Sequence, residues 1–154
     1  CYVCSILPPP PEPAVELVWS PMLRNVLALL AGFVAFFLCS GIFYGVIVYD
    51  AQMEVMQANP EAFHAEPKVG FIVLANLLWV AMVQYVVLLS PHRSVGAAAL
   101  RGAFTLLLVN GGFNFLILGG FKFIPTGFAL LDIAVNTLFG AAAGAAIALV
   151  LNRK

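Results

Sequence analysis

Long apolar runs alternate with short polar segments along most of the chain. Four runs, at about residues 22–49, 69–89, 95–118 and 125–151, each contain at most one charged residue. Each is long enough to cross the roughly 30 Å hydrocarbon core of a bilayer, which takes about 20 apolar residues as a helix. Backbone groups in hydrocarbon must be satisfied internally, which favours helices. The pattern predicts an all-α integral membrane protein, an antiparallel bundle of four spanning helices.

Signals that start and end helices bracket these runs. Ser20-Pro21 combines a capping serine with a first-turn proline, and Pro125 is a second first-turn proline. Ser90-Pro91 ends the second run, and Gly119-Gly120 is expected to end the third. The chain therefore divides into an N-terminal tail, residues 1–20, and a four-helix transmembrane domain, residues 21–154.

The N-terminal tail is rich in proline. Residues 7–13 read LPPPPEP, which favours an extended polyproline segment without internal hydrogen bonds. Apolar residues on both sides of it are unusual for a plain linker, and Trp19 suits a membrane interface. We expect a strap that lies on a partner protein.

The first connection, residues 50–68, is acidic. Its acids are Asp50, Glu54, Glu61 and Glu66, and its apolar residues Val55, Met56 and Phe63 indicate a short amphipathic turn at the interface. His64 stands near two of the acids, but a lone loop histidine is more often solvated than metal-bound, so no metal site is expected.

Composition agrees with a membrane protein. Hydrophobic residues make up 63% of the 154 residues and charged residues 9%, whereas soluble proteins average about 25% charged. The formal net charge is zero, so no basic patch for nucleic acid is expected.

The few cations indicate the orientation. With four spans, one side carries Arg24, Arg93, Arg101, Arg153 and Lys154, and the other carries only Lys68 and Lys122. The positive-inside rule then places both termini in the cytoplasm, and we expect a bacterial inner membrane. Lipidation of Cys1 would need that residue outside, which this orientation opposes.

Polar residues inside the runs gather in the outer half of the predicted bundle. Asp132 is the single ionisable residue of the fourth run, and an acid in lipid is a functional-site hypothesis by default. The candidate cluster consists of Asn76, Asn110, Asn114, Asp132 and Asn136, with Lys122 at its mouth. It is either a satisfied network that fixes helix register or a pocket for a small ligand or ion, and we favour the network.

Small residues mark candidate helix-packing positions. Gly41 and Gly45 in the first run, and Gly140 and Gly144 in the fourth, have the four-residue spacing that lets another helix approach closely. The helix that packs on Gly140 and Gly144 is either the first helix, through Gly41 and Gly45, or a helix of another protein.

No motif indicates catalysis. There is no phosphate loop, zinc pair or nucleophile–base pair, and Cys1-x-x-Cys4 has no second pair beside it. Neither histidine lies in a run, so a haem or pigment could contact this chain only without an axial histidine from it. We expect no enzyme activity and no cofactor, although a bound lipid is compatible with the sequence.

Residues 101–146 resemble a family of small, uncharacterised four-helix bacterial inner-membrane proteins, known as domains of unknown function. The resemblance is carried by Gly102-Ala103-Phe104, Phe113-Asn114, Leu118 to Phe121, Pro125, Leu131-Asp132-Ile133 and Gly140-Ala141. Asn114 matches the end of the family's Asp–Leu–Thr–Asn stretch, and Asp132 matches the acid of its Val–Asp–Ile–x–Trp–Gly stretch. The first aspartate and the tryptophan are missing. The resemblance implies four helices and a pairing of Asn114 with Asp132, and no known activity.

Two hypotheses of function follow. The first is a non-catalytic accessory or structural subunit that packs against a larger membrane protein complex, in contact with lipid and with other membrane subunits. The alternative is a small transporter or ligand-binding membrane protein that uses the polar cluster around Asp132.

Overall fold

The computed structural model describes residues 20–64, 66–91 and 94–153. The expected strap at the N-terminus lies outside these residues, as do Arg93 and Lys154. All regular structure in the described part is helical. Its elements are α1 (Pro21–Ile42), the π-helical turn η1 (Phe43–Ile47), α2 (Tyr49–Ala58), the 3-10 turn η2 (Pro60–Ala62), α3 (Val69–Leu88), α4 (Val95–Gly120) and α5 (Thr126–Leu151).

Four helical stretches in the described part are long and apolar enough to cross a membrane. They are Pro21–Ile47, Val69–Leu88, Val95–Gly120 and Thr126–Leu151. For the described residues, an all-α fold with four helices of membrane-spanning length is therefore confirmed.

Two helix ends differ from the expectation. α4 continues through Gly119 and Gly120, and the chain leaves the helix only at Phe121, whose backbone is extended (φ −134°, ψ 148°). The Phe121 N–H still bonds the carbonyl of Ile117 at 2.8 Å, so the glycine pair completes the last turn. Pro125 caps α5 from outside the helix and is not its first helical residue.

The starts of α1 and α4 follow from capping serines. The Leu23 N–H donates to Ser20 Oγ at 3.3 Å, and the Ala97 N–H donates to Ser94 Oγ at 3.3 Å. Each bond satisfies one backbone donor that a helix start leaves without a partner. The helix start predicted at Ser20-Pro21 is confirmed.

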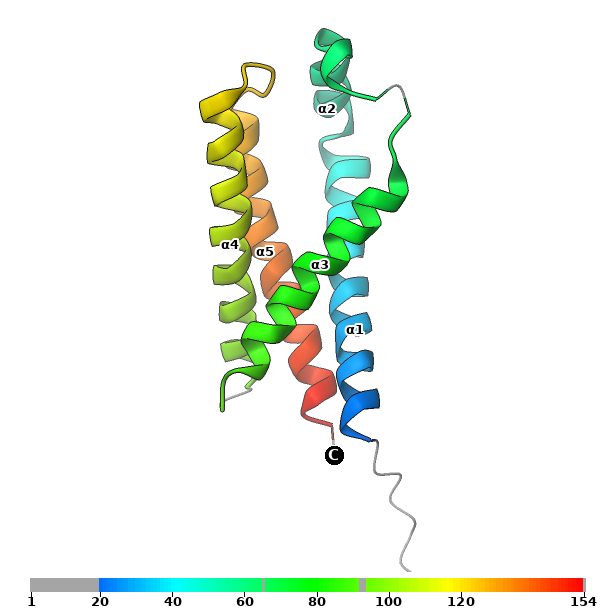
Figure 1. Cartoon of the computed structure of the whole chain (residues 1–154), viewed down its shortest axis with the longest axis vertical. Coiled ribbons are helices and arrows are strands. Elements are labelled where there is room, and N and C mark those ends of the chain that lie inside the picture. The colour runs from blue at the N-terminus through cyan, green and yellow to red at the C-terminus, as the bar shows by residue number, and fades with distance from the viewer. Residues whose placement is uncertain (1–19, 65, 92–93, 154) are drawn as a thin grey trace, which may run out of the picture.

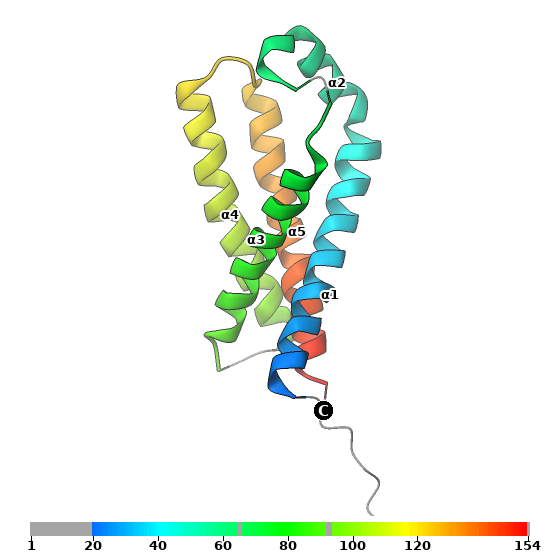
Figure 2. The same ribbon diagram turned by 45° about the vertical axis from the view of Figure 1, so that its right-hand side comes forward.

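The two ends of the described chain lie at the same end of the molecule. Figure 1 shows α4 and α5 side by side, α1 on the other side of α5, and α3 crossing obliquely in front. The turned view keeps this arrangement (Figure 2). We call the end with the start of α1 and the end of α5 the terminal end. The opposite end, with α2 and the α4–α5 loop, is the distal end.

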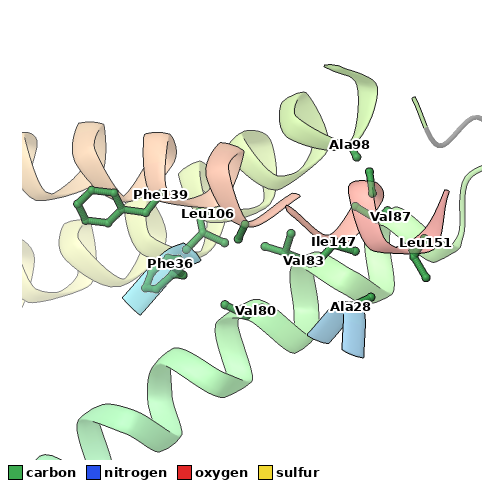
Figure 3. Packing of buried hydrophobic residues seen from close by; sticks show 12 residues of the cluster. Ala28, Phe36, Val80, Val83, Val87, Ala98, Leu106, Phe139, Ile147 and Leu151 are labelled. Atoms are coloured by element: carbon green, nitrogen blue, oxygen red, sulfur yellow. The ribbon is translucent and has the colours of Figure 1, made fainter. Parts of the chain in front are cut away.

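The hydrophobic core lies around α5, toward the terminal end (Figure 3). Half of the apolar window of α5 is buried, against a third or less for the other three spanning helices. The fully buried side chains include Phe36, Val80, Val83, Val87, Leu106 and Ile147, which come from α1, α3, α4 and α5. The central helix is thus the one that carries Asp132.

The closest helix contact joins α4 to α5 through glycines. A Cβ atom added to Gly102 or to Gly140 would lie closer than 3.0 Å to backbone atoms of the other residue, and one added to Gly144 would meet the carbonyl of Ala98. The neighbour of Gly140 and Gly144 is therefore α4. It is neither the first helix nor a helix of another protein, so both alternatives expected from the sequence are wrong.

Gly41 and Gly45 have a different environment from the one expected within a bundle. A Cβ atom added to either would meet no atom within 4 Å, and both residues are exposed. α1 approaches α5 at another glycine, Gly32, where an added Cβ would lie 2.7 Å from the Ile147 side chain. The four-residue spacing alone did not distinguish covered glycines from open ones.

Candidate functional site

The Asp132 carboxylate accepts four side-chain hydrogen bonds from three helical elements. Asn110 and Asn114 each donate from Nδ2 to Oδ2 at 2.8 Å. Asn136 donates from Nδ2 to Oδ1 at 3.2 Å, and the Tyr44 hydroxyl donates to the same oxygen. We call these five residues the Asp132 network.

Helical spacing places the amides of this network. Asn110 and Asn114 are four residues apart on α4, and Asp132 and Asn136 are four apart on α5, so each pair occupies one helix face. The close approach of α4 to α5 at the glycines lets these faces meet. The sequence predicted the convergence of these four residues, and the structure brings them together.

The amides are buried and make further bonds. The exposed fraction is 1% for Asn110, 6% for Asn114 and 3% for Asn136. Asn136 Nδ2 lies 2.8 Å from Tyr44 Oη and 2.9 Å from the Asp132 carbonyl oxygen, and Asn114 Nδ2 lies 3.0 Å from the Asn110 carbonyl oxygen. The NH2 group of each amide therefore has acceptors in the protein that replace water.

Tyr44 is the member that sequence reasoning missed, because it was counted among the bulky aromatic residues of the first run. It lies in the π-helical turn η1, where the Val48 N–H bonds the carbonyl of Phe43, five residues earlier, at 3.0 Å. Such turns are rare and often occur at functional sites. Its depth near the outer end of the first run, similar to that of Asp132, was the signal that could have found it.

Two predicted members do not join the network. Asn76 is buried in α3, 8% exposed, but no hydrogen bond within the described ranges links its side chain to Asp132. The reason is the oblique path of α3, whose distal half lies away from α4 in Figure 1. Lys122 is exposed in the α4–α5 loop, and no ion pair with Asp132 is found in the part of the chain described.

Aromatic rings contact the network on its core side, and a separate aromatic group lies at the distal end. Toward the core, Phe139 contacts the rings of Phe36, Phe43 and Tyr44 at centroid separations of 5.8, 6.0 and 6.4 Å. At the distal end, Phe63 meets Phe123 of the α4–α5 loop edge to face at 5.7 Å. Phe123 also contacts Phe121 in its own loop.

The chemistry of this site is hydrogen bonding around one carboxylate. Both carboxylate oxygens already have two donors each. No three residues among His, Cys, Asp and Glu are grouped to hold a metal ion in residues 20–64, 66–91 and 94–153. The arrangement ties η1, which continues the first spanning helix, to α4 and α5 at a fixed register.

Comparison of the chain with protein-family models, with curated proteins and with solved structures found no match. The resemblance of residues 101–146 to the family of small four-helix inner-membrane proteins stays a prediction.

Proposed function

We propose that this chain is a non-catalytic structural subunit of a larger membrane protein complex. In this proposal the four long helices form an antiparallel bundle in a bacterial inner membrane, with both termini in the cytoplasm. Support for the arrangement comes from the common terminal end of α1 and α5 (Figure 1). Support for the orientation comes from the excess of arginine in the predicted terminal-end segments.

The observation that carries the proposal is the open glycine pair formed by Gly41 of α1 and Gly45 of η1. Gly102, Gly140 and Gly144 are all covered by a helix of this chain, whereas Gly41 and Gly45 have no neighbour within 4 Å of an added Cβ atom. Exposed Leu30, Val34 and Leu38 continue the same face at helical spacing. Small residues favour helix association in lipid because backbones approach closely, so this face fits a helix of another subunit.

The alternative, a small transporter or ligand-binding protein, has less support. A transported ion or ligand would need free coordinating groups at Asp132. Its two oxygens are instead occupied by donors from Tyr44 and the three asparagines. A carboxylate held in this way suits a structural role.

The proposal is tested by purification from the native membrane in mild detergent, followed by quantitative mass spectrometry. The variant Gly41→Leu/Gly45→Leu fills the open face, and Gly112→Leu is the matched control because Gly112 is another exposed, open glycine, on α4. We expect a membrane partner in constant ratio to the wild-type chain and the control, and its loss from the double variant. The expected strap is the tail of residues 1–20, and removal of residues 1–19, which keeps the Ser20 cap of α1, should weaken the same association.

Two results would contradict the proposal. One is migration of the wild-type chain as a lone monomer. The other is equal partner recovery from all three proteins.

A further inference from the structure

A hollow of about 520 Å³ lies at the distal end, between α2 and the start of α3. Its lining residues come from α2, from the connection to α3 and from the first turn of α3. They are Gln52, Met56, Phe63, His64, Pro67, Lys68, Phe71 and Ile72. This volume is within the range of small-molecule sites, about 300–1,000 Å³.

The hollow lies where a spanning helix meets its polar connection. Val69 is the first residue of α3, and the side chains of Phe71 and Ile72, 70% and 50% exposed, begin the apolar surface of that helix. In a membrane this level is the boundary between headgroups and hydrocarbon. The molecules most abundant beside the hollow are therefore phospholipids.

The polar rim of the hollow is positive. Lys68 and His64 are the only lining residues that can carry charge. The four acids of this region, Asp50, Glu54, Glu61 and Glu66, are exposed, and none of them lines the hollow. The start of α3 has no side-chain cap and no acid in its first turn, so its partial positive charge adds to that of Lys68.

We propose that this hollow binds one anionic phospholipid. The headgroup phosphate lies at Lys68 and the start of α3, and the upper acyl chain follows Phe71 and Ile72 toward the hydrocarbon. Apolar walls with a cation at the polar rim match the chemistry of an anionic amphiphile, whereas a zwitterionic lipid gains less from Lys68.

A lipid in the hollow would also stabilise the contact between the α2–α3 connection and the α4–α5 loop. Phe63 lines the hollow, and its ring contacts Phe123 in the α4–α5 loop. A lipid that fixes Phe63 would therefore hold the α2–α3 connection against that loop.

Native mass spectrometry of the full chain in detergent tests the site, with phosphatidylglycerol and phosphatidylcholine of the same acyl chains as probes. Lys68→Gln removes the charge at the rim. Lys122→Gln is the matched control, because Lys122 is exposed at the same end but does not line the hollow. We expect wild type and control to retain one phosphatidylglycerol in preference to phosphatidylcholine. In Lys68→Gln the preference should fall about fivefold, the equivalent of about 1 kcal/mol per basic residue near a lipid surface.

Two further measurements distinguish a bound phospholipid from other ligands of the hollow. Met56→Trp fills the apolar wall from α2 and should lower retention of both lipids. Glycerol phosphate without acyl chains should not displace the bound lipid. Three results would overturn the proposal: equal retention of the two lipids by wild type, an equal loss in the two lysine variants, or displacement by glycerol phosphate. None of them bears on the partner-binding face of α1.

Discussion

The Tyr44 hydroxyl donates a hydrogen bond to the Asp132 carboxylate, across 88 residues of sequence. The donor lies in the π-helical turn of the first spanning helix and the acceptor in the last. This bond, together with the one from Asn136 Nδ2 to the same hydroxyl at 2.8 Å, joins η1 to a network that otherwise belongs to α4 and α5.

Replacement of Asp132 by asparagine is expected to destabilise the protein in detergent. An amide NH2 group replaces one carboxylate oxygen, so its N–H donors face the N–H or O–H donors that this oxygen had accepted from. A buried polar group left without a partner lowers the free energy of unfolding by about 1–3 kcal/mol. The measurement is the thermal melting midpoint by circular dichroism. Asp50→Asn, at an exposed position on α2, should leave the midpoint unchanged. An equal response of the two variants would contradict the network.

Tyr44→Phe should lower the free energy of unfolding by less than Asp132→Asn does. The ring keeps its contacts with Phe43 and Phe139, and Asp132 keeps three donors, so the expected loss is about 1 kcal/mol. Tyr85→Phe is the control, since Tyr85 is 62% exposed. In a double-mutant cycle, Tyr44→Phe should cost clearly less in the Asp132→Asn background. Additive effects would show that the two residues are not coupled.

Gly140→Ala is expected to push α4 and α5 apart. The added methyl would meet the Gly102 carbonyl closer than 3.0 Å, and overpacking of this kind typically costs about 1–3 kcal/mol. Gly112 has open space around it. Gly112→Ala should therefore leave the free energy of unfolding unchanged, or raise it by up to about 1 kcal/mol because alanine has the higher helix propensity. Reversible unfolding in mixed micelles measures both. A Gly140→Ala variant as stable as Gly112→Ala would contradict the close contact.

Cysteine labelling should separate the two ends of the molecule. In a background without native cysteines, an impermeant maleimide added to intact cells is expected to label Gln57→Cys and Lys122→Cys at the distal end. Arg153→Cys at the terminal end should react only after the membrane is opened. Labelling of Arg153→Cys in intact cells would reverse the proposed orientation.

Much of the fold was predictable because hydrocarbon imposes strict demands on backbone and side chains. Apolar length predicted the four long helices, and the i, i+4 spacing predicted that Asn110, Asn114, Asp132 and Asn136 would meet. The Ser20-Pro21 pair predicted where the first helix begins. These signals are local, and each acts within one helix.

The remaining features depend on the angles and positions at which the helices cross. The spacing of residues along the sequence does not determine these. The oblique path of α3 keeps Asn76 out of the network, and the choice between Gly41 and Gly102 as the covered glycine depends on which helix pairs with α5. Tyr44 reaches Asp132 from a π-helical turn that no hydropathy pattern distinguishes from ordinary α-helix. In each case the deciding contact is between residues far apart in sequence.

The origin of the donors to Asp132 has a consequence for biosynthesis. Three of the four, Asn110, Asn114 and Asn136, belong to the hairpin that contains the acid itself. An aspartate on an isolated helix is costly to transfer from the translocon into lipid. If α4 and α5 leave the translocon together, the acid enters the bilayer with its partners already in place, and α1, made first by the ribosome, can dock last.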